Sequence, residues 1–193
     1  MDQKSDIAVF QSHGTVGDFY THKFVEVEAE ALAAKKISFL TANNRGHDVF
    51  ADIRKHTNGT VEWMQVGGAF ERFEDCIFDI EAWVNFLAAQ GVKKIILQGH
   101  SFGPNKTIYY QYKKKDPRVT GFIHLSPQND AGLMKDKLGD KKYDEVNRMI
   151  AQKLKEGKEK EMLPKELQEL CPISVLAYSG YFVEEGVGNL FPY

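Results

Sequence analysis

The chain has 193 residues, of which 42% are hydrophobic and 27% are charged. This length and composition suit one globular domain that buries a substantial core and can carry an insertion. The 25 Lys and Arg residues against 27 Asp and Glu residues give a formal charge of -2, so no nucleic-acid or anionic-membrane partner is predicted and a small molecule is expected.

The first third of the chain contains two strand patterns separated by a helix pattern. Apolar runs at residues 7–11 and 37–41, each closed by turn-forming residues, predict buried parallel strands. Between them, helical spacing predicts a helix from about Thr21 to Lys35 whose apolar face consists of Phe24, Val27, Ala31, Leu32 and Ala34. Residues 49–69 are less regular. We expect a loop or small excursion there, with Asn58-Gly59 as a hairpin signal that can join two short strands.

The middle of the chain repeats the strand-to-helix pattern twice. Apolar residues at steps of three and four predict a helix from Phe70 to Gln90, with Gly91 as its stop. The run 93–97 predicts a strand that leads into a second helix closed by Asp116-Pro117, and 119–127 predicts a fourth strand. Four such steps predict an α/β fold, a doubly wound, mostly parallel sheet flanked by helices.

The composition changes after Pro127, where Lys and Glu dominate. Tyr143, Val146, Ile150 and Leu154 predict an amphipathic helix, and residues 164–170 a short one. Residues 173–178 suit a strand or a helix, of which we favour a helix. We therefore expect a core at residues 1–127 and a helical cap or lid at residues 128–193.

The pentapeptide Gly99-His100-Ser101-Phe102-Gly103 lies between the third predicted strand and its helix. A serine on so tight a turn takes strained backbone angles, and both flanking positions must be glycine because the approaching helix leaves no room for a Cβ. The strand before it and the helix after it make this context much more specific than the pentapeptide alone. The pattern indicates that Ser101 is a nucleophile.

With two further loops the sequence resembles the α/β-hydrolase family, in particular its single-domain serine esterases and lipase-like members. These loops are His13-Gly14-Thr15 after the first strand and residues 44–48, Asn-Arg-Gly-His-Asp, after the second. The resemblance covers residues 7–127 well and the cap loosely. It implies that the backbone N–H groups of Thr15 and Phe102 hold the oxyanion.

Other residues near these motifs have supporting roles or none. His13 and Gly14 belong to the oxyanion loop, where we expect His13 to hold the loop by a hydrogen bond. We expect His100 to pack beside its strand and His124 to lie in the core. Asp130 follows the fourth strand, and it is either an orienting acid or a turn aspartate.

The resemblance also implies a C-terminal histidine as the base, and the sequence departs from it here. The last of the six histidines is His124. The family usually has two strands before the His-Gly loop and two after the cap, whereas six residues precede Ile7 and the chain stops at Tyr193. We therefore expect a fragment, or a sheet whose exposed edges are completed by a second chain or a second copy.

The sequence thus favours a hydrolase of carboxylic esters that forms an acyl-enzyme on Ser101. Acyl transfer to an alcohol or amine is an alternative, and a non-catalytic hydrolase-like binding module is another. The resemblance implies no cofactor, and the two cysteines lack the spacing of a metal or redox site. No stretch approaches membrane-spanning length, so we expect a cytoplasmic protein unless a leader has been removed.

Overall fold

The computed structural model describes residues 5–191, which form two compact units. The first unit runs to Asn44 and includes Asp75–Gln128, and the second consists of Arg45–Glu74 and the residues from Asn129 onward. The division into a core and a cap at residue 127 stays a prediction, and residues 1–4 and 192–193 of those domains lie outside the described residues. The structure places residues 45–74 in the same unit as the C-terminal segment, which the composition did not indicate.

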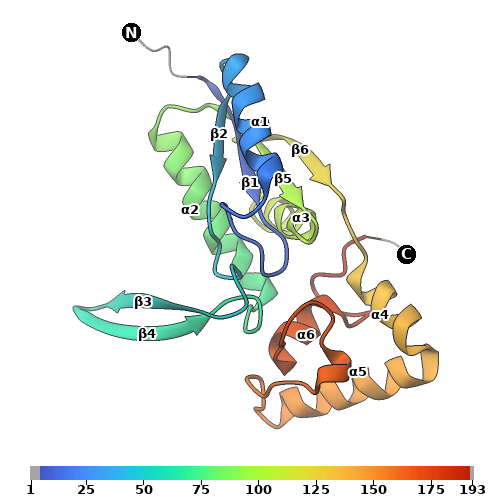
Figure 1. Ribbon diagram of the computed structural model, residues 1–193. Coiled ribbons are helices and arrows are strands. Elements are labelled where there is room, and N and C mark those ends of the chain that lie inside the picture. Colours follow the sequence, from blue (N-terminus) through green and yellow to red (C-terminus); the bar gives the residue numbers. More distant parts are fainter. Residues whose placement is uncertain (1–4, 192–193) are drawn as a thin grey trace. The chain divides into compact units, whose positions relative to one another are not determined.

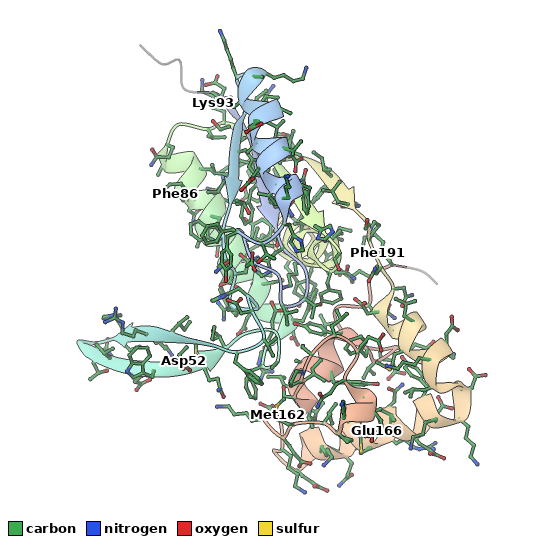
Figure 2. The ribbon with its side chains drawn as sticks, in the orientation of Figure 1. Asp52, Phe86, Lys93, Met162, Glu166 and Phe191 are labelled. Atoms are coloured by element: carbon green, nitrogen blue, oxygen red, sulfur yellow. The ribbon has the colours of Figure 1, made fainter. Side chains whose placement is uncertain are left out.

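The first unit contains a four-stranded sheet in which every neighbouring pair is parallel (Figure 1). The order is β2 (Ser38–Thr41), β1 (Ile7–Ser12), β5 (Lys94–His100) and β6 (Val119–Leu125). Ser12 pairs with Gly99 and Gly99 with His124, so three strands end together at the carboxyl edge of the sheet. At the amino edge, Lys93 forms a 3.0 Å ion pair with Asp6 (Figure 2).

Three helices accompany this sheet. Helix α1 (Lys23–Ala34) follows β1, helix α2 (Cys76–Ala89) precedes β5, and helix α3 (Gly103–Lys114) follows β5. One face of the sheet packs against α2 and α3 to form the apolar core. The buried residues of this core include Phe10, Leu97, Ile80, Val84 and Tyr110. The other face receives α1, as the hydrogen bond from Gln98 to Glu28 of that helix shows. The predicted α/β fold with a parallel sheet between helices is confirmed. The helix expected from residue 70 begins only at Cys76, after the 3-10 turn η1 (Phe73–Asp75).

The apolar face predicted for α1 is only partly right, because Phe24 and Leu32 are half-buried whereas Val27, Ala31 and Ala34 are exposed. Val27 is 60% exposed, and Val25 is the buried residue of this helix. The sheet beneath α1 presents the buried amides of Gln11 and Gln98, and Gln98 Nε2 donates hydrogen bonds to Gln11 Oε1 (2.7 Å) and Glu28 Oε2 (2.6 Å). The helix therefore turns Glu28 toward the sheet, because a buried amide must be hydrogen-bonded.

The core position predicted for His124 is wrong. β6 is one of the two outer strands of the sheet, and its side chains alternate between half-buried and exposed along the whole strand. His124 lies on the exposed face beside Phe122, with 5.8 Å between the ring centroids. The apolar run of β6 thus forms an edge strand, and His124 lies on its solvated face.

The second unit begins with a two-stranded antiparallel sheet, β3 (Ala51–Thr57) and β4 (Thr60–Val66). Asn58 and Gly59 join the strands with φ angles of 50° and 81°, as a two-residue turn of type I′ requires. The predicted hairpin signal is therefore confirmed. Figure 2 labels Asp52 on this hairpin, where it is exposed and paired with Gln65.

The remainder of the second unit is helical. Its elements are α4 (Asp130–Leu138), α5 (Asp140–Lys155), the 3-10 turn η2 (Lys165–Leu167) and α6 (Val175–Tyr181). Tyr143, Val146 and Ile150 are the buried residues of α5, and residues 175–178 are helical, so both helix predictions are confirmed. Within residues 5–191, no helix is long and apolar enough to cross a membrane.

Candidate active site

The turn between β5 and α3 places Ser101 in a strained backbone conformation. Its φ angle is 58°, in the left-handed region that non-glycine residues rarely adopt, at a cost of about 1–2 kcal/mol. The Ser101 N–H donates a 3.0 Å hydrogen bond to the Leu125 carbonyl at the end of β6, which fixes the turn against the neighbouring strand. The strained strand-to-helix turn predicted from the sequence is thus present.

The two glycines that flank this turn have the steric reason predicted for them. A Cβ on Gly99 would lie 2.2 Å from the nitrogen of Pro104, in the first turn of α3. A Cβ on Gly103 would lie 2.3 Å from the carbonyl oxygen of Ser12. Real Cβ atoms do not come this close to backbone, so any side chain at either position displaces the helix or β1.

The loop after β1 packs directly on the turn. A Cβ on Gly14 would lie 2.9 Å from the Phe102 nitrogen and 2.9 Å from the Ser101 Cβ, so only glycine allows this approach. Thr15 follows, and no acceptor in the described part of the chain bonds to its N–H. The structure therefore places Gly14 directly against Ser101 and Phe102, with His13 and Thr15 on either side of it in the chain.

His13 is buried and both of its ring nitrogens are engaged. Nε2 accepts a 2.9 Å hydrogen bond from the Asn44 N–H, so the proton lies on Nδ1, which donates to the Gly14 carbonyl at 2.9 Å. Asn44 also donates from its side chain to Ser12 Oγ at 3.0 Å. The ring holds the loop after β1 and the loop after β2 in place, and neither nitrogen is available as a base.

His100 packs against the start of α1. Its ring centroid lies 5.0 Å from that of Phe24 and 5.3 Å from that of His22. Burial lowers the pKa of His100, and the nearby His22 lowers it further. The imidazole next to the serine is therefore neutral at pH 7.

Asp130 belongs to the second unit, where it is the first residue of α4. Burial raises its pKa, and the negative charge of Glu169 raises it further, to about 6. The residue before it, Asn129, caps the helix by accepting a hydrogen bond from the Gly132 N–H at 2.6 Å. Asp130 is thus a desolvated carboxyl group at a helix start, and its role as an orienting acid stays a prediction.

The sequence reasoning missed a histidine–carboxylate pair in the second unit. His47 Nδ1 lies 2.7 Å from Asp48 Oδ2, an arrangement that leaves Nε2 as the nitrogen able to accept a proton. Asp48 has a φ angle of 55°, and the Gly68 N–H bonds to its carbonyl at 2.8 Å. The signal in the sequence was a His-Asp dipeptide in a polar loop after a strand. The dipeptide alone does not predict the backbone conformation that brings the two side chains together.

The first unit thus holds a strained serine against which the loop after β1 packs. Ser101 Oγ makes no hydrogen bond to another described residue. Among the described residues, no group of three or more His, Cys, Asp or Glu side chains could hold a metal ion. The arrangement suits attack by the hydroxyl on a carbonyl carbon, with the negative oxygen received by the N–H groups of Thr15 and Phe102.

Comparisons with known proteins agree with this fold. A family model described as "Protein of unknown function (DUF1749)" matches residues 68–182, more than half of the chain. No curated protein sequence matches the chain at significant similarity. Among solved structures, an esterase from Pyrococcus furiosus is 18% identical with a TM-score of 0.52, and 92% of this chain covers 59% of that one. A protein from Agrobacterium vitis S4 described as a candidate hydrolase is 15% identical with a TM-score of 0.55, and 95% of this chain covers 60% of that one.

These structural neighbours establish the fold class. The chain has an α/β-hydrolase fold, and it spans about three fifths of the length of the two neighbours. At this identity the likeness concerns the fold, so chemistry has to be argued from the site itself.

Proposed function

Because the chain belongs to the DUF1749 family of proteins of unknown function and has an α/β-hydrolase fold, we propose that it is a serine hydrolase that cleaves carboxylic esters. The observation that carries the proposal is the left-handed conformation of Ser101 between two glycines that cannot bear a Cβ. Backbone strain of this kind is concentrated at functional sites, where the strained conformation is part of the mechanism. The close approach of Gly14 to the Phe102 nitrogen supports the same assignment.

In the proposed reaction the Ser101 hydroxyl attacks the ester carbonyl and gives up its proton to a base. The N–H groups of Thr15 and Phe102 receive the negative oxygen, each worth about 3 kcal/mol in a site sheltered from water. The tetrahedral species expels the alcohol, which takes the proton, and leaves an acyl group on Ser101. Water then releases the acid, and an alcohol or amine in its place would make the protein an acyltransferase.

A second candidate is a non-catalytic binding module with the same fold. It is favoured by the Ser101 hydroxyl, which has no hydrogen-bonded base among the described residues, and by the full engagement of the His13 ring. A serine hydroxyl without a base is a weak nucleophile. A completing chain at the outer strands β2 and β6 would supply one and remains part of the proposal.

The deciding experiment is labelling of the purified chain with a fluorophosphonate, read by intact mass. The hydrolase proposal expects one covalent adduct, which Ser101→Ala abolishes. Denaturation before labelling should remove the reaction, because only a folded site activates the serine. An intact, folded chain without an adduct would favour the binding module or an incomplete hydrolase.

The base can be sought with the same reagent. Separate substitutions by glutamine at His22 and His100, both in the first unit, retain hydrogen-bonding capacity and remove the titratable ring. A variant whose labelling rate falls at least about tenfold while its melting temperature is unchanged would identify the base, since general base catalysis contributes at least that much. Equal rates in both variants would show that neither imidazole is the base.

A further inference from the structure

The segment between β1 and α1 exposes two large aromatic side chains. Phe19 is 46% exposed and Tyr20 is 59% exposed, and their rings meet edge to face with 5.2 Å between the centroids. Rings this exposed add little to the core of the first unit. An exposed aromatic pair with defined geometry is a feature of binding surfaces, because rings lose little conformational entropy when they bind.

Hydrogen bonds hold this aromatic pair in place. The buried Asp18 carboxylate accepts from the Tyr20 N–H at 2.8 Å, from the Thr21 N–H at 2.6 Å and from the Thr21 hydroxyl. The Phe19 N–H donates to Asn43 Oδ1 at 3.2 Å, which joins the segment to the loop after β2. The two rings are therefore presented by a fixed backbone, and a ligand would not have to order it.

The same segment carries the oxyanion loop. Thr15 lies four residues before Phe19, and between them the chain doubles back, with Gly17 N–H bonded to the Gly14 carbonyl at 3.4 Å. A Cβ on Gly17 would lie 2.9 Å from the Cβ of His13, so this turn is closely packed. The aromatic pair is thus carried by the loop whose Gly14 packs against Ser101 and Phe102, a few residues further along the chain.

We propose that Phe19 and Tyr20 form a platform that binds an aromatic group of the ester substrate. That the bound group belongs to a substrate rests on the proposed hydrolase function. Binding of an aromatic group to the platform can be measured without any reaction. Ring faces and edges exposed in a T-shaped pair favour another ring over a short alkyl chain. The platform would therefore select aryl esters over their small aliphatic counterparts.

Binding is tested on the full chain with Ser101→Ala, in which no acyl-enzyme can form. Saturation-transfer NMR with phenyl acetate should show transfer to the phenyl protons. The double substitution Phe19→Ala and Tyr20→Ala in that background should reduce the transfer at least about fivefold. Tyr112→Ala is the matched control, because Tyr112 is 71% exposed on α3 and should leave the transfer unchanged.

Selectivity is tested separately in the chain that keeps Ser101. Two fluorophosphonates that differ in a phenyl or an ethyl substituent should label it at different rates, the phenyl reagent faster by about tenfold. The double variant should lose this preference, whereas Tyr112→Ala should retain both the preference and the rate of the unsubstituted chain. Equal phenyl transfer with and without the two rings would overturn the platform, whereas transfer without any labelling would retain the platform and refute the hydrolase.

Discussion

Replacing Gly14 by alanine tests whether the loop after β1, which packs on the serine turn, supplies an oxyanion donor. The added Cβ would lie 2.9 Å from the Phe102 nitrogen, the His100 oxygen and the Ser101 Cβ, whereas ordinary contacts begin at 3.4 Å. The loop must therefore move about 0.5 Å away from all three of these atoms at once. Hydrogen bonds to an oxyanion depend steeply on such distances, and a lost donor costs about 3 kcal/mol.

We expect Gly14→Ala to lower the rate constant of fluorophosphonate labelling by at least about a hundredfold. The control is Gly121→Ala in β6, where the nearest atom to the added Cβ, Ile96 Cγ1, is 3.8 Å away. That variant should label at the rate of the unsubstituted chain. Both variants should keep their far-ultraviolet circular dichroism spectra. If Gly14→Ala labels as fast as Gly121→Ala, the loop does not supply an oxyanion donor.

Three further predictions concern stability and are checked by urea denaturation. Ser101→Gly should have a free energy of unfolding about 1 kcal/mol above that of Ser101→Ala, because only glycine takes a φ of 58° without strain, and equal values would contradict the strain. Asp130 has a folded-state pKa of about 6 against a usual 3.8, so its charge costs stability as pH rises through that interval. Asp130→Asn should therefore stabilise the chain at pH 8, by up to about 3 kcal/mol, and the gain should vanish near pH 4. Hydrogen bonds from Arg118 lower the pKa of Asp116, which also accepts from the Tyr110 hydroxyl at 2.7 Å. Asp116→Asn should lower the free energy of unfolding by about 2 kcal/mol at pH 7, and the loss should shrink as pH falls below the unfolded-state value; a constant loss would exclude the ionised pair as its cause.

Local sequence determined the parts of the site that neighbouring residues fix among themselves. The order strand, Gly-x-Ser-x-Gly, helix forces Ser101 into its conformation, because Gly99 and Gly103 alone admit the close backbone contacts that the turn creates. The Asn58-Gly59 turn is local in the same sense, since both residues tolerate a positive φ. These features could be predicted because they depend on steric limits over a few residues.

Only the tertiary structure decided which faces are buried and which side chains meet. Val27 is exposed because the sheet beneath α1 presents the amides of Gln11 and Gln98, and that pairing joins residues 87 positions apart. His124 is exposed because the strand order places β6 at the edge, where an apolar run has one solvated face. The hydrogen bond that holds Phe19 through Asn43 likewise depends on two loops meeting at one edge of the sheet. Side-chain periodicity shows that an element has two faces, but the partner that covers each face is set by packing across the chain.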